Sequence, residues 1–158
     1  MRAAPLYETP IAADWIDYNG HLRDAYYGLI LSLATDALMD RLGLDAPYRE
    51  RTRCTLYTVE MHIHYLREVR QSDVVVVSAA ILGNDAKRIH AALRLVCAGQ
   101  TDPAATAEIM LLHIEQGDTP ATAPFPAPIL RAIEQFRTQW GGPIAGPGSR
   151  RMELRSRT

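Results

Sequence analysis

The pattern of apolar and polar positions changes twice along the chain. A short strand is predicted over residues 6–12, broken at Pro10, and a polar and aromatic loop follows it. Between Asp24 and Leu42, large apolar residues recur at helical intervals around much of the helix circumference, and Gly43 then supplies the expected stop. We therefore predict a long helix that other parts of the chain wrap on several sides.

After residues 45–53, which are predicted to be a polar connection, the period changes from helical to alternating. The alternation favours a strand with one face built for burial. Its apolar positions are Tyr57, Val59, Met61, Ile63 and Tyr65, and its polar positions are Thr58, Glu60, His62 and His64. A valine-rich run at 73–82, a turn at 83–85 and an alternating run at 89–97 predict a hairpin, and 105–115 predicts a final strand.

These elements predict one α+β domain. The antiparallel strands need a partner for their apolar face, and the long helix is the only element before residue 116 that is large and apolar enough. Pro126 opens a second helix with an amphipathic stripe, which we expect to cap the domain. The stripe consists of Ile129, Ile133, Phe136 and Trp140. Residues 1–140 are predicted to form this single domain and residues 141–158 a flexible C-terminal tail.

Composition narrows the function classes. The chain has 158 residues, of which 47% are hydrophobic, and a formal net charge of -1, which gives no general attraction to nucleic acid or to an anionic membrane. Cys54 and Cys97 lie in apolar runs and are expected to be buried thiols in a reducing compartment. With no signal peptide and no apolar stretch that could span a bilayer, the expected location is the cytoplasm. The five histidines show no metal-ligand spacing, so neither a metal nor a cofactor is expected.

Chemically active side chains are concentrated in the loop at residues 14–21, just before the long helix. Loops with such a mixture of acid, amide, imidazole and aromatic groups often carry function. An ordinary structural explanation also exists: Asp17 and Asn19 hydrogen-bond to turn amides, Asn19-Gly20 forms a tight turn, and His21 or Asp24 caps the helix. From the residues alone, both interpretations remain open.

The order of elements resembles the hot-dog fold, a curved antiparallel sheet wrapped around a long central helix. The motif Asp17-x-x-Gly20-His21, followed by Tyr26-Tyr27, resembles the active-site signature of the 4-hydroxybenzoyl-CoA-type thioesterases. This resemblance covers roughly residues 6–140. It implies that Asp17 is the catalytic carboxylate, that backbone amides near Gly20 and the helix start polarise the thioester carbonyl, and that dimers hold the substrate between subunits. Whether such dimers assemble further into tetramers stays open.

Three further runs, at residues 36–45, 56–62 and 65–69, are similar to betainyl-CoA thioesterases and to the thioesterase domain fused to some carnitine dehydrogenases. That similarity implies hydrolysis of betainyl-CoA to glycine betaine and CoA in carnitine breakdown. Two alternatives remain: a thioesterase for aryl or short-chain acyl-CoA, and a hot-dog protein that binds acyl-CoA without turning it over.

Thioester hydrolysis needs a nucleophile or activated water, and donors for the developing oxyanion. Asp17 is predicted as nucleophile or general base, Asn19 as a holder of the water or carboxylate, and Gly20 and His21 as amide donors, with the His21 ring orienting the loop or donating to the substrate. A trimethylammonium head requires aromatic faces and a carboxylate. The predicted substrate-binding residues are Trp15, Tyr26, Tyr27, Tyr57, Glu60 and His62, although a solvated strand face would also explain Glu60 and His62. The candidates for CoA phosphates are Arg67, Arg70, Lys87 and Arg88.

Overall fold

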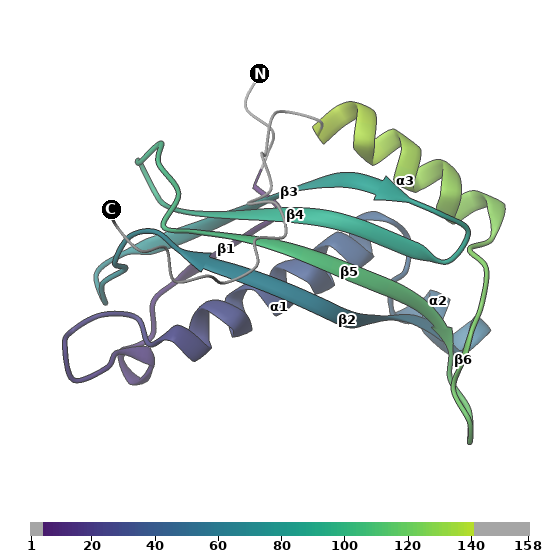
Figure 1. Cartoon of the computed structure of the whole chain (residues 1–158), viewed down its shortest axis with the longest axis horizontal. Coiled ribbons are helices and arrows are strands. Elements are labelled where there is room, and N and C mark those ends of the chain that lie inside the picture. Colours follow the sequence, from purple (N-terminus) through teal and green to yellow (C-terminus); the bar gives the residue numbers. More distant parts are fainter. Residues whose placement is uncertain (1–4, 141–158) are drawn as a thin grey trace, which may run out of the picture.

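The computed structural model describes residues 5–140 and shows a curled antiparallel sheet wrapped around one long helix (Figure 1). The strands are β1 (Tyr7–Pro10), β2 (Cys54–Tyr65), β3 (Val74–Asn84), β4 (Arg88–Cys97), β5 (Ala105–Glu115) and the short β6 (Ala121–Thr122). The helices are η1 (Ala13–Trp15), α1 (Asp24–Arg41), α2 (Ala46–Thr52) and α3 (Ala127–Trp140). The strand order is β1-β3-β4-β5-β2, and β6 pairs with the end of β5. The predicted α+β hot-dog architecture is confirmed, whereas the predicted tail at 141–158 lies outside the described residues.

Helix α1 fills the concave side of the sheet, as its wide apolar circumference predicted. Ile30, Leu31 and Leu38 are completely buried, and the helix ends before Gly43, which has a φ of +80°. A left-handed residue at this position lets the chain leave the helix while its last carbonyls stay hydrogen-bonded. At its other end, the N-terminus of α1 directly follows the loop that contains Asp17.

Strand β2 departs from the predicted alternation because it contains a bulge between Thr58 and Glu60. Tyr57 pairs with Leu112 and Glu60 with Met110, and directly opposed residues share a face, so the bulge brings Tyr57 to the outer, Glu60-bearing face. The outer face is the one directed away from α1. The prediction that Tyr57 lies with the buried set is thus wrong.

Strand β2 also lies at the edge of the sheet, with no strand beyond it among the described residues. For this reason Val59 and Tyr65, which were also predicted to be buried, are 54% and 53% exposed. Met61 and Ile63 do pack against the core, as predicted.

Residues 45–53 contain a helix, α2, and the prediction of a polar connection there is wrong. The side chain of Asp45 accepts a hydrogen bond from the Tyr48 amide at 3.0 Å, and Pro47 lies in the first turn, so the usual start signals of a helix are present. The buried Tyr48 hydroxyl is hydrogen-bonded to His113 Nε2 at 3.0 Å. The buried Tyr48 side chain therefore anchors α2 to β5. The charged residues of this segment hid the helix in the sequence.

Helix α3 covers the domain as predicted, with Ile129, Ile133 and Phe136 buried in the same core as α1. Cys97 is buried, but Cys54 is only half-buried, and both thiols are free. Among residues 5–140, no helix combines the length and apolarity that crossing a membrane requires.

Candidate active site

The loop before α1 is closed on itself by short hydrogen bonds. The Asp17 amide donates to the His21 carbonyl at 2.8 Å, and the Gly20 amide donates to the Asp17 carbonyl at 3.0 Å. Gly20 has a φ of +81°, a conformation that side chains with a Cβ rarely adopt. The Leu22 amide then donates to the Val69 carbonyl at 2.7 Å, which pins the loop to the β2–β3 connection. Asp17 is thus held by a rigid turn at the start of α1.

The Asp17 carboxylate is held in its charged form by main-chain amides. Its Oδ1 accepts from the Asn19 amide at 2.8 Å and from the His21 amide at 3.2 Å. The hydrogen bond from His21 is the largest cause that lowers the pKa of Asp17, the Asn19 bond adds to it, and desolvation opposes both. Among the described residues, Oδ2 has no partner. Asp17 therefore combines a stable negative charge with one uncommitted oxygen, as a base or nucleophile requires.

The amides of Gly20 and His21 were predicted to stabilise an oxyanion, but both already donate to Asp17. At the first residue of α1, the Asp24 amide has no acceptor among the described residues. The side chain of Asp24 is occupied instead with the Ala25 amide at 2.9 Å. Free amides of a first helical turn attract negative charge, so the Asp24 amide is the candidate donor within the first helical turn, which was predicted together with Gly20 and His21.

A hollow of about 300 Å³ opens beside this loop. Its charged and aromatic lining residues are His21, Asp24, Tyr27, Tyr65, Arg67 and Glu68. The rings of Tyr27 and Tyr65 meet edge to face with centroids 5.2 Å apart, and the Tyr65 hydroxyl donates to the Asp24 carbonyl at 3.4 Å. His21 Nε2 lies 3.0 Å from Glu68 Oε2. The helix start and the end of β2 together form this hollow.

The aromatic residues predicted for substrate binding divide into two groups. Trp15 and Tyr26 stack with ring centroids 5.4 Å apart, next to the Asp17 loop. Tyr27 lines the hollow, and burial is the main cause that raises its pKa to about 12, so its hydroxyl stays protonated at neutral pH. Tyr57 lies elsewhere, on the outer face of the sheet. Tyr65 and Glu68 were not predicted to bind substrate, because both lie more than 40 residues after the Asp17 loop in the sequence.

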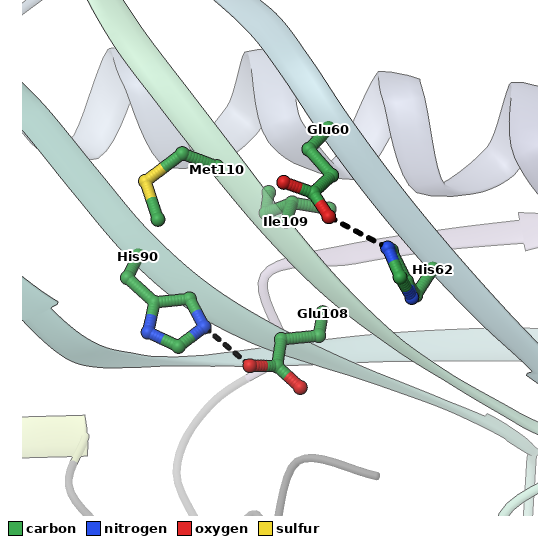
Figure 2. Close-up of a pocket in the computed structure, with 6 residues that line it drawn as sticks. All are labelled: Glu60, His62, His90, Glu108, Ile109 and Met110. Atoms are coloured by element: carbon green, nitrogen blue, oxygen red, sulfur yellow. Dashed lines mark hydrogen bonds and ion pairs between the residues drawn. The ribbon is translucent and has the colours of Figure 1, made fainter. Parts of the chain in front are cut away.

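Glu60 and His62 line a second hollow, of about 250 Å³, on the outer face of the sheet (Figure 2). His62 Nε2 is 2.8 Å from Glu60 Oε1, and His90 Nε2 is 2.5 Å from Glu108 Oε1. The second oxygen of Glu108 is buried and has no hydrogen-bond partner. Because this face is directed away from α1, one protomer does not bring Glu60 and His62 together with Asp17.

The four basic residues proposed for CoA phosphates lie at two ends of the sheet. Arg67 and Arg70 belong to the β2–β3 connection beside the Asp17 loop, and Arg67 forms an ion pair with Asp102 at 2.5 Å. Lys87 and Arg88 follow the turn between β3 and β4. Strand β3 has 11 residues, so its two ends are roughly 35 Å apart. One protomer therefore does not place all four at the same phosphate group.

Within residues 5–140, no group of three or more His, Cys, Asp or Glu side chains is arranged to hold a metal ion.

Comparison with known families gives a direct assignment. Residues 11–133 match the Thioesterase-like superfamily. A betainyl-CoA thioesterase of Pseudomonas aeruginosa is 44% identical over 128 residues, which cover 81% of this chain and 80% of the relative. An L-carnitine dehydrogenase/betainyl-CoA thioesterase of Agrobacterium fabrum is 40% identical over 95% of this chain, which spans 31% of that longer protein.

Solved structures agree with this assignment. A protein of Pseudomonas putida described as a putative thioesterase has a TM-score of 0.87 and 42% identity, with 99% of both chains covered. A Staphylococcus aureus protein solved in complex with CoA also has a TM-score of 0.87, with 28% identity and 98% of both chains covered. The match over most of the chain and the shared architecture lead to one conclusion: the chain belongs to the thioesterase-like superfamily and is an acyl-CoA thioesterase with the hot-dog fold.

Proposed function

We propose that this enzyme hydrolyses betainyl-CoA to glycine betaine and CoA, in carnitine breakdown in the cytoplasm, with Asp17 as the catalytic carboxylate. The observation that carries the catalytic role is the charged Asp17 side chain, held by two amides at the start of α1 with Oδ2 uncommitted. The similarity to a betainyl-CoA thioesterase at 44% identity supports the substrate. The two free thiols suit a reducing compartment.

Two groups supply the proposed chemistry, one in the loop before α1 and one at the first residue of α1. Asp17 Oδ2 either removes a proton from a water that attacks the thioester carbonyl or attacks that carbon itself, giving a mixed anhydride that water then opens. In both cases a carbon–oxygen bond forms, the carbon–sulfur bond breaks, and CoA leaves as a thiolate that takes up a proton. The Asp24 amide and the positive end of α1 stabilise the carbonyl oxygen as it becomes negative. Asn19 shapes the turn through its amide.

We also propose that two copies associate through β2. Exposed apolar side chains lie on this edge strand at Tyr57 and Val59 and directly after it at Leu66, and unpaired strand edges readily add another strand. Such a dimer would extend both sheets and place material from the partner next to the hollow beside Asp17. Sedimentation velocity should show a dimer at micromolar concentration, and a monomer at that concentration would contradict this arrangement.

A panel of thioesters tests the substrate. Betainyl-CoA, acetyl-CoA, a short-chain acyl-CoA and benzoyl-CoA are compared by release of free CoA thiol, and we expect the highest kcat/KM for betainyl-CoA. Equal or faster hydrolysis of acetyl-CoA or benzoyl-CoA would overturn the substrate while leaving the thioesterase assignment intact. A protein that binds these thioesters without releasing thiol would contradict the catalytic role of Asp17.

A further inference from the structure

The position of the cationic head is restricted by the length of the acyl group. In betainyl-CoA, the quaternary nitrogen is two bonds from the thioester carbon, a separation of about 2.5 Å with ordinary bond lengths. The attacking oxygen approaches that carbon to about 3–3.5 Å. If Asp17 acts as proposed above, the head must therefore lie in a hollow that adjoins the Asp17 loop.

The hollow lined by His21 satisfies this condition, because the His21 amide is bonded directly to the Asp17 carboxylate. Its walls include the rings of Tyr27 and Tyr65, of which Tyr65 is 53% exposed. A quaternary ammonium has no N–H to donate and is attracted instead by aromatic faces and negative charge. An exposed ring at the mouth of the hollow provides such a face.

The charges at the hollow also favour a cation. Asp24 and Glu68 supply two carboxylates, and each uses one oxygen in a contact: Asp24 Oδ1 accepts from the Ala25 amide, and Glu68 Oε2 contacts His21. The guanidinium of Arg67, which also lines the hollow, is paired with Asp102. The balance of charge beside Tyr65 is therefore negative.

The outer-face hollow is a poor alternative. Glu60 and Glu108 are each hydrogen-bonded to a histidine, and both lie on the face of the sheet opposite α1. Structural layers stacked on a sheet are about 10 Å apart, so a head two bonds from the reacting carbon does not extend from the α1 side to the outer face. Glu60 thus becomes a useful control.

We propose that Tyr65, Asp24 and Glu68 form the pocket for the trimethylammonium head, and that these three residues determine the preference for a cationic acyl group. The proposal rests on betainyl-CoA being the substrate. It assigns substrate selection to the end of β2 and the start of α1, whereas Asp17 supplies the reaction itself.

The test compares betainyl-CoA with 3,3-dimethylbutanoyl-CoA, in which carbon replaces the charged nitrogen at equal shape. The ratio of the two kcat/KM values measures recognition of charge. We expect the wild type to favour betainyl-CoA, and the ratio to fall about tenfold or more in Asp24→Asn/Glu68→Gln and about fivefold in Tyr65→Leu, with Tyr65→Phe close to wild type because it keeps the ring. Circular dichroism checks that each variant is folded.

Glu60→Gln is the matched control, a carboxylate-to-amide change on the same strand that should leave the ratio unchanged. If the wild type favours betainyl-CoA but the Asp24, Glu68 and Tyr65 variants keep its ratio, the pocket assignment is wrong and the proposed substrate stands. Loss of the ratio in Glu60→Gln would also overturn the assignment. If the wild type shows no preference for betainyl-CoA over the neutral isostere or acetyl-CoA, the proposed substrate itself fails.

Discussion

The loop before α1 and the outer face of the sheet both carry carboxylates close to histidines, and they differ in what holds the carboxylates. On the outer face, Glu60 and Glu108 are each hydrogen-bonded to a histidine side chain, at 2.8 Å and 2.5 Å (Figure 2). At the start of α1, Asp17 is held by main-chain amides and keeps one oxygen uncommitted. Carboxylates are therefore held by histidine side chains on the outer face and by main-chain amides in the loop before α1.

The difference shows why similar residues do not make equivalent sites. A main-chain amide stabilises a carboxylate through a fixed dipole that cannot itself gain or lose a proton at neutral pH, so Asp17 stays charged and available. A neighbouring imidazole is a group that can itself gain or lose a proton near neutral pH, so it is a less constant partner for a carboxylate than an amide is. We expect the unused Asp24 amide at the start of α1 to favour the Asp17 loop over the outer face for thioester hydrolysis.

The largest expected effect is on turnover, and it should distinguish the Asp17 loop from the outer face. Asp17→Asn removes the base or nucleophile but keeps the shape of the side chain, so we expect kcat/KM for betainyl-CoA to fall by about 100-fold or more. Glu108→Gln, the matched change on the outer face, should alter kcat/KM by less than about threefold. Thiol release measures turnover, and calorimetric titration with CoA checks that Asp17→Asn still binds the product.

Comparable losses in both variants would show that the outer face takes part in the reaction. A fully active Asp17→Asn enzyme would instead show that the loop has only the structural role of a tight turn.

The fold was predictable where a local sequence pattern is compatible with only one secondary structure. The helical repeat of α1 and the stop at Gly43 determine that element without help from distant residues. The bulge in β2 was not predictable, because Val59 matches the alternating pattern and only its pairing with β5 shows that it is an extra residue. Helix α2 was missed for another reason: its charged residues hide a start signal at Asp45 and Pro47 that is visible in the sequence.

The candidate site shows the same limit. Asp17, Gly20 and His21 could be identified because the loop that holds them is contiguous. Tyr65 ends β2 and Glu68 lies in the β2–β3 connection beside the loop, whereas Glu60 and His62, five and three positions before Tyr65 on the same strand, lie on the opposite face. The register of the sheet decides which strand residues lie beside the loop before α1. A period-two pattern in the sequence does not reveal that register.

The smallest effect concerns stability within the outer-face hollow, where the two Glu–His pairs differ in burial. The Glu108 side chain is 17% exposed and its second oxygen has no partner, whereas the Glu60 side chain is 65% exposed. His90→Leu leaves a mostly buried carboxylate unpaired and should lower the free energy of unfolding by about 1–3 kcal/mol. His62→Leu should change it by about 0–1 kcal/mol, because water solvates Glu60 in its place.

Urea denaturation of both single variants measures these changes, and the double variant His90→Leu/Glu108→Leu supplies the control. Replacing both partners by apolar groups removes the unpaired charge, so the double variant should recover most of the stability that His90→Leu loses. Equal effects of His90→Leu and His62→Leu would contradict a difference based on burial. Recovery in the double variant would show that the loss in His90→Leu comes from the unpaired Glu108 carboxylate, so this pair affects stability, in contrast to Asp17, whose replacement should cost activity far more than stability.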